Sequence, residues 1–204
     1  MSLPAAAGVI AGVLGFFDAY PYIRHTLKGT TRPHRGSWLI WGVLGIIVFS
    51  SQLADGATWS LIMVGSQTVL IIAIFLLSLR FGEGELTRTN TALLLLAGLG
   101  CAGWALASAP VIATYCVVFA DAIGVVMMLP KTWRDPSSET FATYALASGS
   151  GVLSALAVGR LDAHLLVYPI YFAASCGLLA GVIAYRHRVL REVPSLAPGD
   201  TRHV

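Results

Sequence analysis

Two stretches of this sequence decide the fold: PYIRHTLKGTT, residues 21–31, and PKTWRDPSSET, residues 130–140. Each follows a long apolar run, begins with a proline and continues into a basic loop. A glycine lies six residues before each proline, at Gly15 and Gly124. Because the same features recur in the same order, they predict that the chain is built from two related halves.

The composition around these stretches is that of a membrane protein. Of the 204 residues only 11% are charged, against about 25% in a soluble domain. A spanning helix needs roughly 20 apolar residues, and this length predicts an all-α membrane protein of seven transmembrane helices. No Lys or Arg precedes the first apolar run, so we expect a retained helix there instead of a cleaved signal peptide. The expected spans are residues 5–24, 37–54, 58–79, 91–108, 110–130, 140–158 and 163–185.

The basic residues predict the orientation of these spans. Seven spans place twelve of the 13 Lys and Arg residues on one side of the membrane, and Arg160 alone on the other. Loops rich in Lys and Arg stay in the cytoplasm. The sequence therefore predicts a protein of the plasma or inner cell membrane, with its N-terminus outside and its C-terminus in the cytoplasm.

A second set of matches extends the repeat. Residues 37–41 (SWLIW) correspond in character to 140–144 (TFATY), and 53–56 (LADG) to 156–159 (LAVG), at one offset of 103. Three spans reverse the chain and a fourth reverses it again, so both halves enter the membrane from outside, as a parallel repeat. The expected domains are a three-helix bundle (1–86), a linker helix (87–109), a second three-helix bundle (110–188) and a disordered cytoplasmic tail (189–204).

The stretches 21–31 and 130–140, with Gly36-Ser37-Trp38 following the first, resemble the PQ-loop motif of the SWEET, SemiSWEET and PQ-loop transporter superfamily. The resemblance covers nearly the whole chain in its layout of three helices, a linker helix and three helices. The motif's glutamine is replaced by Tyr22 and Lys131. The resemblance implies a transporter that moves a small polar solute by alternating access, and it leaves sugars and vitamins open as substrates.

The same resemblance implies that Pro21 and Pro130 are hinges. A proline removes a backbone hydrogen bond and clashes with the preceding turn, so a helix bends there. The alternative is that both prolines simply end helices.

Two acids lie inside expected spans. Asp121 is near the middle of the fifth span, and Asp18 lies three residues before Pro21 in the first. A charged side chain at the centre of a membrane costs about 2.5–3.5 kcal/mol on insertion scales. Both are therefore candidates for proton coupling or for a polar contact to the solute. The alternative is a structural acid that faces the interior of the bundle.

Polar and aromatic residues complete the candidate site. In relatives of the resembled family the third helix of each bundle lines the midplane pocket, which implies Gln67, Tyr168 and Tyr171 as solute-binding residues. For Gln67 an interhelical hydrogen bond is the alternative. Trp41 and Tyr144 are repeat-matched aromatics that form either a stacking wall for the solute or part of an interfacial belt.

The remaining patterns argue against other classes of function. The chain has no Walker loop, no His-Glu-x-x-His and no Gly-x-Ser-x-Gly, so we expect neither an enzyme nor a cofactor. Its three cysteines lack the spacing of a metal site, and no aromatic-rich basic stripe suggests nucleic acid. The expected partners are a small-molecule solute and the lipid bilayer, and a homo-oligomer stays open. The alternative function is a seven-helix receptor or cargo-binding protein on the same scaffold, whose site would open to one face only.

Overall fold

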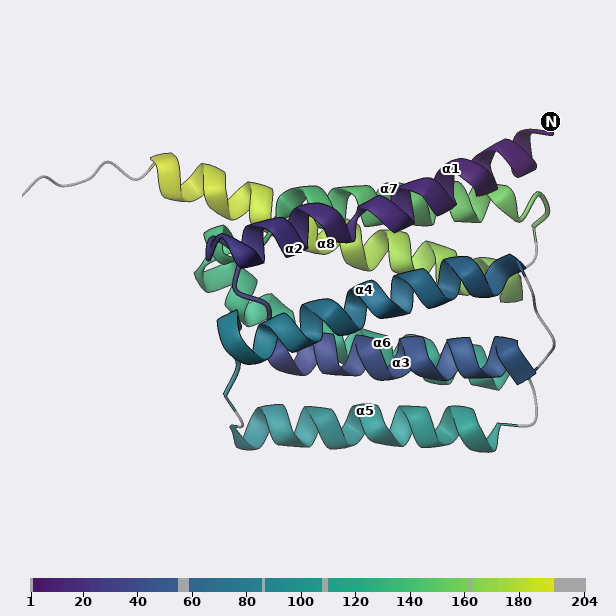
Figure 1. The fold of residues 1–204 in the computed structure, drawn as a ribbon, viewed down its shortest axis with the longest axis horizontal. Coiled ribbons are helices and arrows are strands. Elements are labelled where there is room, and N and C mark those ends of the chain that lie inside the picture. The colour runs from purple at the N-terminus through teal and green to yellow at the C-terminus, as the bar shows by residue number, and fades with distance from the viewer. Residues whose placement is uncertain (1, 55–58, 86, 108–109, 162, 193–204) are drawn as a thin grey trace, which may run out of the picture.

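The computed structural model describes residues 2–54, 59–85, 87–107, 110–161 and 163–192, and in these ranges the chain is helical with no strand. The helices run side by side along the long axis of the molecule (Figure 1). They are α1 (Leu3–Phe17), α2 (Ala19–Leu27), α3 (Arg35–Ala54), α4 (Trp59–Phe81), α5 (Arg88–Leu106), α6 (Pro110–Arg134), α7 (Phe141–Ala157) and α8 (Ala163–Glu192), with a 3-10 turn, η1, at Pro136–Ser138.

The outer surface of this assembly is apolar. Large hydrophobic side chains such as Val69, Leu95 and Leu99 are 65%, 69% and 68% exposed, whereas soluble monomers rarely expose wide apolar patches. Three further apolar helices are shorter within the described residues: Arg35–Ser50, Gly65–Phe81 and Phe141–Ala157. The segments long and apolar enough to cross a membrane are Leu3–Leu27, Arg88–Leu106, Thr114–Arg134 and Leu165–Glu192. The prediction of an all-α, membrane-embedded protein is thus confirmed.

Two helices run beyond their expected ends. α6 continues through Pro130 to Arg134, and α8 continues to Glu192, where it protrudes beyond its neighbours (Figure 1). Both extensions are basic, and charged residues prefer water at the ends of a span. Residues 189–192, the first part of the segment expected to be disordered, are therefore helical, and 193–204 lie outside the described residues.

Neither repeat-matched proline ends a helix. α1 stops at Phe17 and α2 starts at Ala19, so the break lies at Asp18, one turn before Pro21. A proline at position 21 cannot donate to the carbonyl of Phe17, which favours a break there. α2 then runs on to Leu27 and ends before Gly29, whose φ of 73° suits a helix C-terminus.

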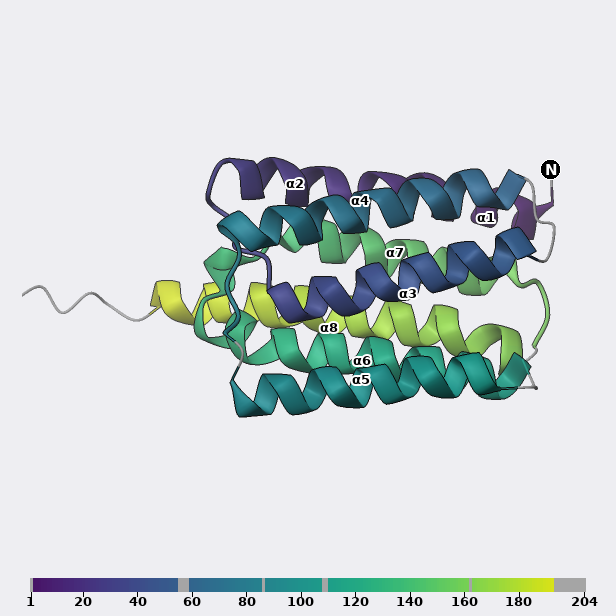
Figure 2. The ribbon, with the colours of Figure 1, turned by 60° about the horizontal axis from the view of Figure 1, so that its bottom comes forward.

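The packing order of the helices is the same in the two halves of the chain. In the first half α4 contacts both α2 and α3, and in the second α8 contacts both α6 and α7. Within the described residues the backbones of α1 and α3 do not approach one another closely, nor do those of α6 and α7, although Tyr144 of α7 contacts Met128 of α6 through its side chain. In each half, the last helix (α4 or α8) therefore lies between the other two helices of that half. The sets meet through α1 with α7 and α3 with α6, while α5 packs on α6 (Figure 2).

The two repeat-matched glycines lie at these two contacts. A Cβ added to Gly15 would lie 3.2 Å from Ser150 Oγ, and one added to Gly124 would lie 2.7 Å from Trp41 Nε1. Ser150 Oγ also donates a hydrogen bond to the carbonyl oxygen of Ala11, 2.8 Å away. Both contacts thus depend on a close approach that a larger residue would block.

One end of the molecule carries almost all of the basic residues. The C-terminal ends of α2, α4, α6 and α8 lie together at the left of Figure 1, and the N-terminus of α1 lies at the other end. Of the twelve basic residues expected on one side, Arg202 lies outside the described residues, and the other eleven belong to the helix ends and loops of this basic end. Arg160 follows α7, at the opposite end.

Candidate functional site

A cavity of about 740 Å³ lies between the two sets of helices. Residues of every helix from α1 to α8 contribute to its lining. It extends from Gly8 and Ser154, toward the end opposite the basic loops, to Trp38 and Tyr144 at the basic end. Ligand sites in proteins commonly have volumes of about 300–1,000 Å³, so a small molecule fits this space.

Most of the candidate residues named from the sequence meet at this cavity. Tyr171 is not part of the lining, but its hydroxyl donates a hydrogen bond to Asp121 Oδ2 at 2.6 Å. Pro21 and Pro130 lie outside the lining, in α2 and α6. The lining contains Asp18, Trp41, Gln67, Asp121, Tyr144 and Tyr168.

The two cavity acids come from different halves of the chain. Asp18, at the α1–α2 break, is 5% exposed and hydrogen-bonds with the Gln67 side chain of α4. Gln67 therefore makes an interhelical hydrogen bond and lines the cavity as well. Asp121 belongs to α6, and Cys176 of α8 lies close enough to both carboxyl groups to feel their charges. The acids thus share one polar region.

A buried charge cluster closes the cavity at its basic end. Glu139 lies just before α7, and its side chain is 0% exposed. The hydroxyls of Tyr22 and Tyr144 each donate to Glu139 Oε2 at 2.9 Å, and Lys131 Nζ donates to Oε1. Trp38 Nε1 donates to the Tyr22 hydroxyl at 3.1 Å. These five residues are called the Glu139 cluster below.

The Glu139 cluster joins the two halves of the chain. Tyr22 and Trp38 come from α2 and α3, Lys131 and Tyr144 from α6 and α7. Trp38 and Tyr144 also line the cavity, so the cluster lies directly at its basic end. A buried charge requires a partner and hydrogen bonds. Lys131 of the second half provides the opposite charge for Glu139, and the hydrogen bond from Tyr22 to Glu139 joins the first half to the second.

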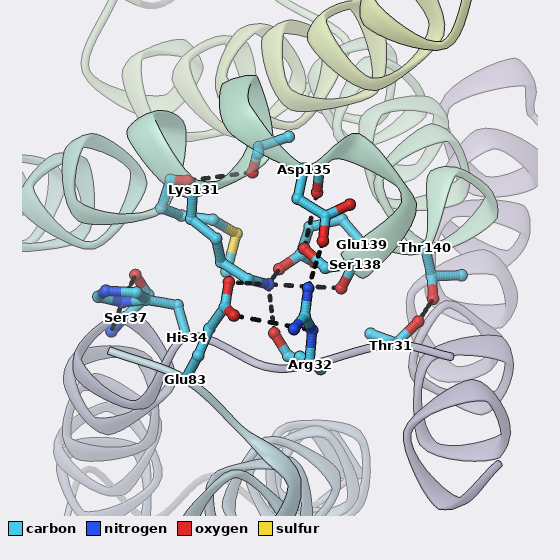
Figure 3. Close-up of polar contacts among 12 residues, drawn as sticks. Thr31, Arg32, His34, Ser37, Glu83, Lys131, Asp135, Ser138, Glu139 and Thr140 are labelled. Carbon is cyan, nitrogen blue, oxygen red and sulfur yellow. Dashed lines mark hydrogen bonds and ion pairs between the residues drawn. The ribbon is translucent and has the colours of Figure 1, made fainter. Parts of the chain in front are cut away.

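A more exposed group of ion pairs lies beside Lys131 and Glu139 (Figure 3). Arg32 pairs with Asp135 and lies 3.7 Å from Glu83, and Lys131 Nζ lies 3.8 Å from Glu83. A hydrogen bond from Ser137, together with the charge of Arg32, holds the pKa of Asp135 below its usual range. The Arg32 side chain is 47% exposed, and pairs of this kind contribute about 0–1 kcal/mol. The buried pair therefore matters more to stability than this exposed group.

His34, in the loop before α3, is neutral. Burial, followed by the nearby cations Lys131 and Arg35, lowers the pKa of His34 to about 4. Its Nδ1 accepts a hydrogen bond from the Ser37 backbone N–H at 3.3 Å, which places the proton of the neutral ring on Nε2. The ring therefore carries no charge at neutral pH.

Sequence reasoning named Tyr144 as a site residue but missed the other four members of the Glu139 cluster and Thr143. Tyr22 and Lys131 directly follow the two matched prolines, and this shared position could have marked both residues as candidates. Glu139 lies in a loop by sequence, where an acid is expected in water. Thr143 lines the cavity with a buried hydroxyl that has no hydrogen-bond partner, and its sequence surroundings carry no signal for this.

Comparisons with known proteins add nothing to this description of the site. Among the described residues no three or more His, Cys, Asp or Glu side chains are grouped so as to hold a metal ion. Searches of protein-family models, of curated proteins and of solved structures found no match to this chain.

Proposed function

We propose that this protein is a membrane transporter that carries a small polar solute through the central cavity by alternating access. One observation carries the proposal: a cavity that contains the side chains of Asp18, Gln67 and Asp121 lies between two similarly ordered sets of helices, and a cluster that crosses between the sets closes one of its ends. Transporters built from parallel repeats bind their substrate near the midplane, between the repeats. The solute would therefore lie close to Asp18, Gln67 and Asp121.

The proposed architecture has seven membrane spans in a layout like that of the PQ-loop and SWEET superfamily. α1 with α2, α3 and α4 form the first three-helix bundle, α6, α7 and α8 the second, and α5 is the linker. The middle positions of α4 and α8, and the matched glycines at the two contacts between bundles, support a parallel repeat.

The proposed motion is a rocking of one bundle against the other. Opening the basic end requires the Glu139 cluster to separate, because that cluster bridges the bundles. Tyr22 and Lys131 each follow a proline directly. A bend at Pro21 would move Tyr22 away from Glu139, and a bend at Pro130 would move Lys131 and Glu139 together away from Tyr22. The two prolines are thus the hinges of the proposed mechanism.

The orientation is a first test of this architecture. With the basic end in the cytoplasm of the plasma or inner membrane, a fluorescent protein fused to the C-terminus should be fluorescent, and an alkaline phosphatase fused there should be inactive. A phosphatase fused after Arg160 provides the opposite control and should be active. High phosphatase activity at the C-terminus would reverse the orientation.

Cysteine labelling tests alternating access without a known solute. Ala147 of α7 lines the cavity and is 5% exposed. In a variant whose Cys101, Cys116 and Cys176 are replaced by alanine, Ala147→Cys should react with a membrane-impermeant thiol reagent added from either side. Leu99→Cys, on the exposed apolar face of α5, is the matched control and should react from neither side. Labelling of Ala147→Cys from one side alone would favour the alternative function, a receptor whose site opens to one face only.

A further inference from the structure

We propose that the solute is a small organic cation that also carries an oxygen atom able to accept a hydrogen bond. This inference rests on the proposed function, because it assigns a substrate class to the same cavity. It is carried by the charge of the cavity, by its aromatic lining and by a buried hydroxyl that has no partner.

The charge of the cavity is entirely acidic. Among the described residues that line the cavity, the carboxylic acids are Asp18 and Asp121, and none of the lining residues is Lys, Arg or His. Each carboxyl group has a neutral neighbour, Gln67 for Asp18 and Tyr171 for Asp121. A carboxylate can accept about four hydrogen bonds, so both retain free acceptor positions. An anionic solute would be repelled here, whereas a cation would supply the missing opposite charge.

Aromatic rings line the same space. Tyr168 and Phe172 of α8 stack with their ring centroids 6.1 Å apart and an angle of 18° between their planes. Both rings line the cavity, as do Trp38, Trp41 and Trp104. The faces of indole and phenol rings attract ammonium groups. The cavity therefore combines aromatic side chains with carboxyl groups, which is the combination that recognises an organic ammonium.

A buried donor provides an independent observation that points to a ligand. Thr143 is 5% exposed, lines the cavity, and its Oγ1 has no hydrogen-bond partner. A buried polar group without a partner destabilises a protein. An oxygen atom on the solute would satisfy this hydroxyl while its cationic group binds the acids.

The test compares cations with neutral molecules of the same shape. Choline is paired with 3,3-dimethylbutan-1-ol and benzylamine with benzyl alcohol, while glucose represents neutral polyols. The purified full-length protein is melted with increasing amounts of each compound. A cation should raise the Tm saturably, by about 5 °C or more, and choline should exceed benzylamine because it carries a hydroxyl. The neutral partners should leave the Tm unchanged.

Variants connect the effect to the cavity. Asp18→Asn combined with Asp121→Asn should abolish the cation-induced shift, and Asp135→Asn, an exposed acid outside the cavity, should leave it unchanged. A shift from a neutral partner equal to that of its cation, a shift from glucose alone, or no shift from either cation would overturn the inference. The proposed function is judged separately, since labelling of Ala147→Cys from both sides would still indicate transport.

Discussion

The Glu139→Gln variant should melt on the order of 10 °C below the wild-type protein. Glu139 and Lys131 form an ion pair whose side chains are 0% and 7% exposed. Removing one member of a buried pair costs about 3–5 kcal/mol, because the remaining charge is left buried without its partner. For a chain of this length about 1 kcal/mol corresponds to roughly 2–4 °C in Tm. Thermal unfolding of the purified protein, followed by circular dichroism, measures the effect.

Two companion variants show whether the buried charge is the cause. Combining Glu139→Gln with Lys131→Met removes both charges and should recover most of the lost stability, since an apolar replacement of a buried pair is often neutral. Asp135→Asn breaks an ion pair whose side chains are 47% and 38% exposed, and should cost about 1 kcal/mol or less. A Glu139→Gln protein that melts at the wild-type temperature would contradict the role of the cluster.

The Asp121→Asn variant should lose accumulation of solute driven by a pH gradient. Asparagine has nearly the shape of aspartate, and its amide oxygen can still accept the hydrogen bond from the Tyr171 hydroxyl. It cannot carry a proton across the membrane, so coupling is lost while the fold is kept. Uptake into liposomes with and without an imposed pH gradient measures this, with choline or benzylamine as the transported cation. Exchange of the cation across the liposome membrane without a pH gradient should continue at a reduced rate, because Asp18 still binds the cation.

The control for this variant is Tyr171→Phe. It removes the hydroxyl that contacts Asp121 and leaves the titratable acid in place, so gradient-driven accumulation should persist. If Asp121→Asn accumulates solute as the wild type does, Asp121 is a structural acid, and Asp18 is left as the candidate for coupling.

The membrane class of this protein follows from its sequence alone. A low charge content and apolar runs of about 20 residues are local properties, and they predicted where the chain is helical. The grouping of twelve basic residues in alternate loops also predicted which helix ends lie together, because successive spans reverse direction. The sequence also predicts the repeat, since Gly15 and Gly124 keep the same distance to their prolines, and close helix contacts need a small residue at such positions.

The sequence predicted only part of the candidate site. Position along a span gives the depth of a residue, so Asp18, Gln67 and Asp121 were identified as buried polar groups. It does not give the face of the helix on which a residue lies. Because α8 is apolar around most of its span, its sequence did not show that Tyr168 lines the cavity whereas Tyr171 reaches it only through Asp121.

Tertiary structure alone decided that Glu139 is buried. By sequence it is an acid in a polar loop, which predicts a side chain in water. The fold instead brings Tyr22, 117 residues away, and Tyr144 to the same carboxylate oxygen. Lys131, from the end of α6, provides the opposite charge. Whether an acid is hydrated or buried depends on such partners, and contacts between distant segments exist only once the helices have packed.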